Sequence, residues 1–227
     1  FCSKHSGSLL ELFISGRPFR SPCCGKRVWG LSMSNPAKEK VRCSWCNASD
    51  VYKNYHDQEW GIPLKGSADL FKLLTLEGMQ AGLAWITVLN KREHMQKLFF
   101  GFDMVKMANA TQDDVEFWLQ DAGIIRHRGK LNAMIGNAQS ALELDNFGEF
   151  LWQFAPPVRN TNKAFAVPAQ TSDSNAMSKA LKAKGFRFVG PTICYAFMQS
   201  AGMVNDHHAD CWRYADCQKL LKASVRT

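Results

Sequence analysis

The stretch Lys184-Gly185-Phe186-Arg187-Phe188-Val189-Gly190-Pro191-Thr192 lies between two segments with helical patterning. The first helix is expected to end at Gly185, because glycine commonly closes a helix. A tight apolar turn follows, and a second helix begins at the Gly-Pro-Thr sequence of 190–192. The stretch therefore predicts two helices joined by a short hairpin.

The start of the second hairpin helix has the features of a phosphate-binding site. Exposed backbone N–H groups at a helix start can bind a DNA phosphate. Four basic residues lie nearby, namely Lys179, Lys182, Lys184 and Arg187. A plain helical hairpin with a solvated lysine face is the alternative interpretation.

Helical patterning continues on both sides of the hairpin. Ser172 or Asp173 is suited to cap the helix before it, and residues 192–201 form the helix after it. Upstream we expect a helix capped by Ser67, one over 85–99, one from the capped start 111–114 with Gly123 as its stop, and one over 131–142. Residues 155–171 are a polar connection, and strand alternation is absent. The sequence predicts an all-α domain of six or more helices.

Composition excludes several classes of protein. The 227 residues are 46% hydrophobic and 21% charged, as is usual for folded soluble proteins. No stretch approaches the roughly 20 apolar residues of a membrane helix. Eight cysteines are too sparse for a small disulfide-stapled secreted protein. A reducing cytoplasm is therefore expected, with cysteines that are free or bound to metal.

Residues 1–32 differ from the rest of the chain. They contain five basic residues and one acidic residue, which accounts for +4 of the net charge of +8, and they show no helical or strand period. Met33 then opens the patterned part. We predict that 1–32 is a disordered leader or upstream extension, and that 33–227 is the helical domain. A basic arm that binds DNA is the alternative.

Two clusters of cysteine and histidine have metal-ligand chemistry. The first is the C-x-x-C motif 43–46, which is followed by His56, and the second is the run 207–211. Because His207 and Cys211 are four residues apart, we expect both on one face of a helix. Zinc takes four nitrogen and sulfur ligands in a structural site. The candidate ligands are Cys43, His56, His207 and Cys211, with Cys46 and His208 as competitors, and ordinary buried side chains or a redox C-x-x-C as alternatives.

An acidic residue, Glu77, lies within an otherwise apolar helical stretch. Trp85 follows eight residues later, and Tyr52, Tyr55 and Trp60 lie upstream. Aromatic rings with one carboxylate suit a flat, electron-poor base, because they offer stacking faces and an anionic acceptor. Packing in the core is the alternative for each ring. A further basic run, 126–130, could contact phosphates or be solvated.

In combination, these motifs resemble the DNA-3-methyladenine glycosylase I family of bacteria. The similarity covers about residues 42–214. The matching stretches are Arg42-Cys43 with Trp45, Tyr55-His56-Asp57 with Glu59-Trp60-Gly61, Leu76-Glu77-Gly78 with 80–83 and 85–89, 121–130, Gly185-Phe186 with 188–190, and 204–207. The sequence departs from the family at 212–214, where members can show a more cysteine-rich stretch.

The resemblance implies a fold and a set of site residues. The fold would be that of a helix-hairpin-helix DNA glycosylase, with one structural zinc joining the N- and C-terminal parts through Cys43, His56, His207 and Cys211. Glu77 would be the catalytic acid of the pocket, and the substrate-binding aromatic residues would be Tyr52, Tyr55, Trp85 and Trp45. We expect DNA contacts from Gly82 and Leu83, which would form a wedge in the duplex, and from Arg128, Lys130, Gly190 and Thr192.

The implied reaction is hydrolysis of the N-glycosidic bond of 3-methyladenine in alkylated double-stranded DNA, after the base is flipped into the pocket. We expect a monomer that acts in the cytoplasm at the bacterial nucleoid, without contact with a membrane. Asp206 is the alternative catalytic residue, because many relatives in the wider superfamily use an aspartate after the hairpin. A zinc-stabilised, non-catalytic nucleic-acid-binding module is the competing class, and such a module would not need Glu77.

Overall fold

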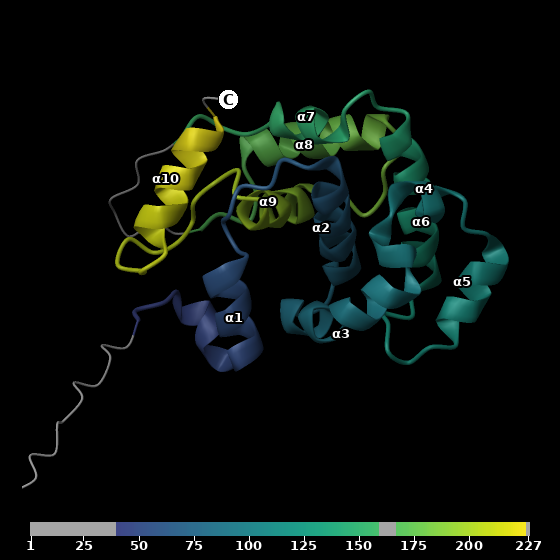
Figure 1. Cartoon of the computed structure of the whole chain (residues 1–227). Coiled ribbons are helices and arrows are strands. Elements are labelled where there is room, and N and C mark those ends of the chain that lie inside the picture. The colour runs from purple at the N-terminus through teal and green to yellow at the C-terminus, as the bar shows by residue number, and fades with distance from the viewer. Residues whose placement is uncertain (1–39, 159–166, 226–227) are drawn as a thin grey trace, which may run out of the picture. The chain divides into compact units, whose positions relative to one another are not determined.

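A computed structural model describes residues 40–158 and 167–225, and these residues are helical throughout their regular parts (Figure 1). They contain no strand, which confirms the prediction of an all-α fold. The predicted leader 1–32, the start at Met33 and part of the connection 155–171 lie outside the described residues. The helices are η1 (Ser44–Ala48), α1 (Asp50–Gln58), α2 (Ser67–Gln80), α3 (Trp85–Leu98), η2 (Phe100–Phe102), α4 (Met104–Ala108), α5 (Gln112–Leu119), α6 (Arg128–Leu142), α7 (Phe147–Trp152), α8 (Ser172–Ala183), α9 (Pro191–Ser200) and α10 (Tyr214–Ser224).

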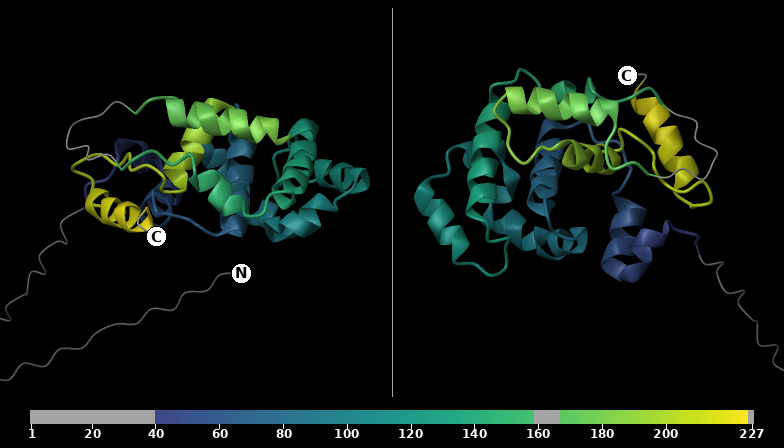
Figure 2. Two further views of the ribbon diagram at one scale, coloured as in Figure 1. Left: turned by 90° about the horizontal axis from the view of Figure 1, so that it is seen from above. Right: turned by 180° about the vertical axis from the view of Figure 1, so that it is seen from behind.

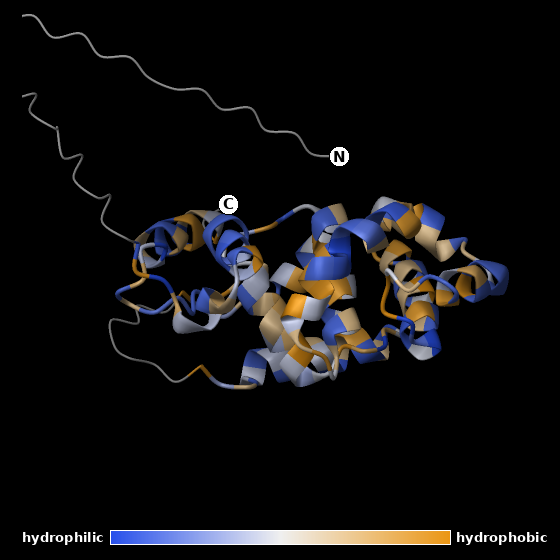
Figure 3. Ribbon diagram, turned by 90° about the horizontal axis from the view of Figure 1, so that it is seen from below, coloured by the Kyte–Doolittle hydropathy of each residue, from blue (hydrophilic) through white to orange (hydrophobic). Residues whose placement is uncertain are grey.

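Helix α2 lies at the centre of the helical domain, in contact with α3, α6, α7 and α9. Leu70, Phe71 and Leu74 are buried at helical spacing, which gives α2 a face that packs into the main core. Figure 3 shows the same division on other helices, which carry hydrophilic residues on one side and hydrophobic residues on another. The C-terminal half of α2 also carries Glu77, and its packing on α9 brings this acid to the functional site.

Helices α8 and α9 pack together across the predicted hairpin. Gly185 has φ +90, a backbone conformation that other residues rarely adopt, so a glycine is needed at this turn. The Asn137 side chain of α6 donates to the Arg187 carbonyl at 3.0 Å and accepts from the Arg187 N–H at 2.8 Å. Ser178 of α8 donates to the Val189 carbonyl at 2.6 Å. These bonds fix the backbone of the hairpin on two neighbouring helices.

Two predicted helix caps are wrong by one or two residues. Helix α8 is capped by Thr171, not by Ser172 or Asp173, because the Thr171 side chain accepts from the N–H three residues later. Gly66 is the cap of α2, and Ser67 is its first residue. The Ser67 hydroxyl instead accepts a hydrogen bond from the Gly148 N–H at 3.0 Å, so tertiary contact has replaced the local cap.

The other predicted helices agree with the structure, except that α5 ends at Leu119 with Gln120 as its cap and does not extend to Gly123. The segment 85–99 contains α3, and Thr111 caps α5 in a capping box with Asp114. The short helices α1, α4, α7 and α10 were not predicted individually. Only Tyr55 and His56 of α1 are buried, and so few apolar contacts leave a weak periodic pattern in the sequence.

The first described residues lie beside the C-terminal segment (Figure 2). The Trp212 N–H donates to the Val41 carbonyl at 3.0 Å. A small apolar cluster at this place contains Cys43, Tyr55 and Cys211. Within 40–158 and 167–225, no helix is long and apolar enough to cross a membrane.

Candidate functional site

A cavity of about 410 Å³ lies between α1, the end of α2, the start of α3 and α9. Five aromatic side chains line it, namely Trp45, Tyr52, Tyr55, Trp60 and Trp85. The rings of Tyr55 and Trp85 are 5.5 Å apart at 57°, and those of Trp45 and Trp60 are 5.0 Å apart at 76°. The structure thus brings the aromatic residues singled out in the sequence to one pocket, whose flat walls suit a planar ligand.

Glu77 contributes a carboxylate to this cavity, and the residue is only 3% exposed. Its Oε1 accepts a hydrogen bond from the Ser200 hydroxyl at 2.8 Å, and Ser200 Oγ accepts one from the Tyr55 hydroxyl at 3.0 Å. Burial raises the pKa of Glu77 to about 7, although the bond from Ser200 opposes this shift. Burial also raises the pKa of Tyr55, so its hydroxyl stays a donor. The hydrogen bonds thus run from Tyr55 through Ser200 to Glu77, and this direction favours an ionised Glu77 as the acceptor at the end of the chain.

Tyr52 and Trp85 differ in whether their polar side-chain atoms have hydrogen-bond partners. The Tyr52 hydroxyl accepts from the Ile86 N–H at 3.0 Å and so holds the first turn of α3 against α1. The Trp85 Nε1 donor is buried and has no hydrogen-bond partner among the described residues. A buried donor without a partner costs about 1–3 kcal/mol, so a ligand with a suitable acceptor would gain by meeting it.

A second carboxylate, Asp206, lines the same cavity. Its Oδ2 accepts from the Tyr195 hydroxyl at 2.6 Å and from Gln199 Nε2 at 2.8 Å. Asp206 is partly exposed and the neighbouring Thr192 is exposed, so this carboxylate lies nearer the solvent than Glu77. The pocket therefore contains a deep acid and an outer acid.

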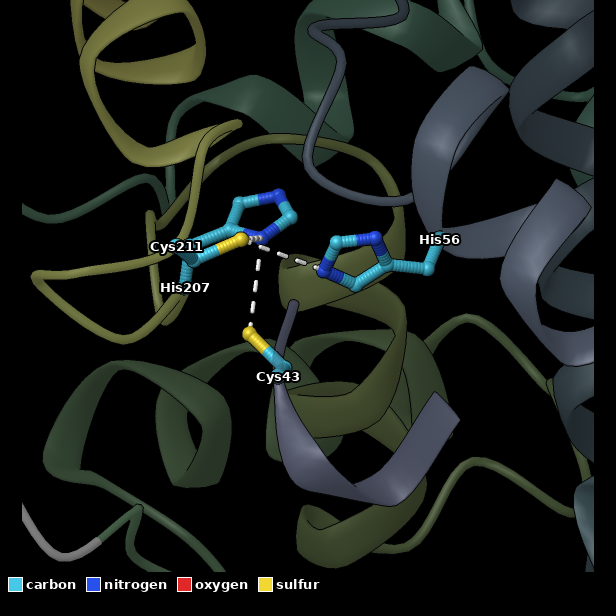
Figure 4. A group of neighbouring side chains, drawn as sticks. All are labelled: Cys43, His56, His207 and Cys211. Carbon is cyan, nitrogen blue, oxygen red and sulfur yellow. Dashed lines mark hydrogen bonds between the residues drawn. The ribbon is translucent and has the colours of Figure 1, made fainter. Parts of the chain in front are cut away.

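Cys43, His56, His207 and Cys211 form one buried cluster, in which the ligand atoms all lie within 4.8 Å of one another (Figure 4). Cys43 Sγ is 3.6 Å from His207 Nδ1, and Cys211 Sγ is 3.4 Å from His56 Nε2 and 3.5 Å from His207 Nδ1. Tetrahedral zinc with bonds of ~2.3 Å to sulfur and ~2.0–2.1 Å to nitrogen separates its ligands by about 3.6 Å. The donor set and its spacing fit such an ion.

The charges of the cluster also suit a cation. A hydrogen bond between the two thiols raises the pKa of Cys43 and lowers that of Cys211, which favours the thiolate form of Cys211. A bound metal ion would displace the thiol proton of Cys43. Cys46 donates to the Cys43 carbonyl at 3.0 Å and lies outside the cluster, as does the exposed His208.

In each histidine of the cluster, the ring nitrogen that points away from the cluster lies near a hydrogen-bond acceptor. His56 Nδ1 is 2.8 Å from Asp57 Oδ1, and His207 Nε2 is 3.3 Å from the Trp60 carbonyl. Partial burial alone would raise the pKa of Asp57, but hydrogen bonds from Arg42 and His56 outweigh it and lower the pKa to about 2. Such outer partners fix which ring nitrogen faces a metal ion.

One prediction about this cluster is wrong. His207 and Cys211 were expected on one face of a helix, but 201–213 contains no helix. The Cys211 N–H donates to the His208 carbonyl at 2.9 Å, so a turn brings the two ligands together. A spacing of four residues fits both conformations.

The residues predicted to contact DNA differ in their exposure and in their hydrogen bonds. Gly82 and Leu83 are exposed in the turn between α2 and α3, and Gly190 and Thr192 lie at the accessible start of α9. These four positions are open to a partner. Arg128 is exposed but forms a two-bond ion pair with Glu116.

Lys130 contradicts the prediction of a phosphate contact. It is only 6% exposed, and its Nζ donates to the carbonyls of Met79 at 2.8 Å and Ala81 at 2.6 Å. Its ammonium group therefore binds the end of α2 and is not presented to DNA.

Sequence reasoning missed three polar residues of the site. Ser200 links Tyr55 to Glu77 but lies 123 residues from Glu77 along the chain, so no local pattern connects the two. Asp57 and Gln199 form hydrogen bonds with His56 and Asp206 respectively. Asp57 directly follows His56, and this adjacency was the one signal that could have pointed to it.

Comparison with known proteins identifies the chain as a glycosylase, which is a hydrolase. A model of the methyladenine glycosylase family matches residues 45–214. The chain belongs to the methyladenine glycosylase family. It is 51% identical over 180 residues to DNA-3-methyladenine glycosylase 1 of Escherichia coli strain K12, which covers 76% of this chain and 96% of that relative.

Solved structures agree with this assignment. A crystal structure of 3-methyladenine DNA glycosylase I has a TM-score of 0.73 and 46% identity, covering 76% of this chain and 98% of its own. A structure of the Staphylococcus aureus enzyme, described in terms of 3-methyladenine recognition, has a TM-score of 0.72 and 34% identity, covering 76% of this chain and 96% of its own. The helical fold of this chain is thus shared with known glycosylases.

Proposed function

We propose that this protein hydrolyses the N-glycosidic bond of 3-methyladenine in alkylated double-stranded DNA. The observation that carries the proposal is the buried carboxylate of Glu77 in a pocket with aromatic walls. The similar proteins named for 3-methyladenine support this substrate. A base-release assay on methylated DNA tests the proposal, because the competing class, a non-catalytic binding module, would bind DNA without releasing a base.

The chemistry follows from the charge of the damaged base. Methylation at N3 gives the base a positive charge in the nucleotide, so it leaves as a neutral molecule when the C1′–N9 bond breaks and the electron pair moves onto the base. The sugar passes through an oxocarbenium-like state. Water then forms the new bond to C1′ and loses a proton to solvent. The base therefore needs no proton from the enzyme, only an environment that binds its cationic form.

In this proposal Glu77 accepts a hydrogen bond from the adenine edge and complements the positive charge. Tyr52, Tyr55, Trp85 and Trp45 hold the flipped base between their rings. The unpartnered Trp85 Nε1 supports this role, because a purine offers ring nitrogens as acceptors. Asp206 remains the alternative catalytic residue, since it lines the outer part of the same pocket.

The proposed DNA contacts surround the pocket. The hairpin and the start of α9 form the helix-hairpin-helix element, in which Gly190 and Thr192 receive a phosphate at the N–H groups that the first turn leaves unpaired. The exposed residues Gly82 and Leu83 fill the gap that the flipped nucleotide leaves. Arg128 adds positive charge at the surface.

We further propose that the Cys43, His56, His207 and Cys211 cluster holds one zinc ion. Bound zinc would supply a structural cross-link between the N- and C-terminal parts, and it has no place in the reaction. Because the net charge outside 1–32 is small, we expect the protein to bind DNA through local contacts. We also expect a monomer that acts in the cytoplasm of a bacterial cell. Gel filtration tests the expected monomer.

The release rate should depend on pH through Glu77. The pKa of this carboxyl is raised to about 7 by burial, so its ionised fraction falls as the pH drops below that value. If the ionised form is required, kcat/KM should be constant above about pH 7 and should fall about tenfold per pH unit below it. A profile that stays flat from pH 5 to 8 would contradict the role of ionised Glu77.

Trp85→Ala should weaken the binding of free 3-methyladenine by about 1–3 kcal/mol, because the base loses a stacking partner. Calorimetric titration measures this change directly. Phe117→Ala is the matched control, because Phe117 is 66% exposed and does not line the pocket. Equal affinities of the wild type and Trp85→Ala would remove Trp85 from the base site.

A further inference from the structure

We propose that Lys130 is a positioning residue, which anchors the turn 81–84 so that Leu83 can enter the duplex. The inference rests on the proposed role of Leu83 in filling the gap in DNA. We define 81–84 as the insertion turn. It joins α2, which carries Glu77, to α3, which begins at Trp85.

The two hydrogen bonds of the Lys130 ammonium group converge on the start of the insertion turn. Its Nζ donates to the Met79 carbonyl at 2.8 Å, in the last turn of α2, and to the Ala81 carbonyl at 2.6 Å, at the first position of the insertion turn. Helix carbonyls at a C-terminus lack partners within the helix and carry partial negative charge. The ammonium group satisfies two such carbonyls and stabilises the end of α2.

The rest of the insertion turn has few anchors of its own. Gly82 has φ +77 and no atom near its missing side chain, and Leu83 is 37% exposed. The turn is closed by short hydrogen bonds from the Leu83 N–H to the Gln80 carbonyl and from Gln80 Nε2 to the Leu83 carbonyl, both at 2.6 Å. These bonds set the local shape of the turn, whereas Lys130 ties it to another helix.

That other helix also holds the hairpin. Asn137 of α6 binds the backbone of Arg187 through two hydrogen bonds. Lys130 and Asn137 are seven residues apart, which places them on one side of α6, about 10 Å apart along its axis. Helix α6 thus connects the two elements proposed to face DNA, with Lys130 at the insertion turn and Asn137 at the hairpin. This arrangement accounts for a lysine at a buried position.

The test separates binding of DNA from binding of the base. Lys130→Met keeps the length and burial of the side chain but removes its donors. We expect it to weaken binding to a duplex with one tetrahydrofuran abasic site by about tenfold or more, as for the loss of hydrogen bonds from a charged group. The affinity for free 3-methyladenine should change less than about twofold. Lys130→Arg should restore most of the DNA affinity.

A double-mutant cycle tests whether Lys130 affects DNA binding through Leu83. In a Leu83→Gly background, Lys130→Met should change abasic-duplex affinity less than about twofold, because the inserted side chain is already missing. Equal effects in both backgrounds, or a matching loss of base affinity, would overturn the proposal. If Lys130→Met does not fold, Lys130→Gln replaces it in the same cycle, with an intermediate loss expected. Because abasic-duplex binding needs no catalysis, the test stands even if the wild type releases no base.

Discussion

Glu77→Gln is expected to lower the rate of 3-methyladenine release by roughly one to two orders of magnitude. The substitution keeps the shape of the side chain and removes its charge, and a charge-assisted hydrogen bond is worth about 1.5–3 kcal/mol. Single-turnover release from methylated duplex DNA measures the effect. The free energy of unfolding at pH 8 should not fall, because burial of the ionised carboxyl, whose pKa is about 7, disfavours the folded state.

The matched comparison for Glu77→Gln is Asp206→Asn, which makes the same chemical change in the outer part of the pocket. We expect Asp206→Asn to have the smaller effect. A wild-type release rate for Glu77→Gln together with slow release by Asp206→Asn would assign catalysis to Asp206. Asp206 directly precedes a predicted metal ligand, so the metal content of Asp206→Asn should be measured in parallel.

Cys43→Ala and Cys211→Ala are expected to abolish stoichiometric zinc binding and to lower the free energy of unfolding by several kcal/mol. The two residues lie near opposite ends of the described chain, and a metal ion that closes so long a loop couples its binding to folding. Elemental analysis gives the metal content, which should be about one zinc per wild-type chain, and urea unfolding gives the stability.

Cys46→Ala serves as the control for these variants, because Cys46 is buried three residues from Cys43 but lies outside the cluster. It should keep the zinc. A wild-type protein that is fully folded without metal and loses no stability on chelation would contradict the structural role of zinc.

Much of the fold could be predicted because local signals and tertiary packing agree. The segment from Thr111 has both a capping box and an apolar face, and the hairpin has Gly185 at its positive φ. Where the signals disagree, the predictions fail. Ser67 is a good capping residue, yet its hydroxyl binds the Gly148 N–H from a segment 81 residues away. Contacts of this kind leave no trace in the local sequence.

In the site, too, local sequence signals identified some residues, whereas long-range contacts determined the roles of others. Glu77 could be singled out because an acid is unusual in an apolar helical stretch, and the aromatic residues because they lie near it in the sequence and match the motifs of the family. Lys130 was misinterpreted because charge in a sequence does not reveal direction, and its ammonium group points to backbone carbonyls inside the protein. Ser200 was missed because a serine in an apolar helix looks unremarkable until Tyr55 and Glu77 are placed beside it.

The most direct test of the proposed function is to incubate the wild-type protein with methylated duplex DNA and to identify the released bases by chromatography. We expect free 3-methyladenine with one abasic site for each base released. Undamaged adenine should stay in the DNA, since it lacks the positive charge that Glu77 complements. Binding of the methylated duplex without release of any base would contradict the proposed function and would indicate a non-catalytic DNA-binding module.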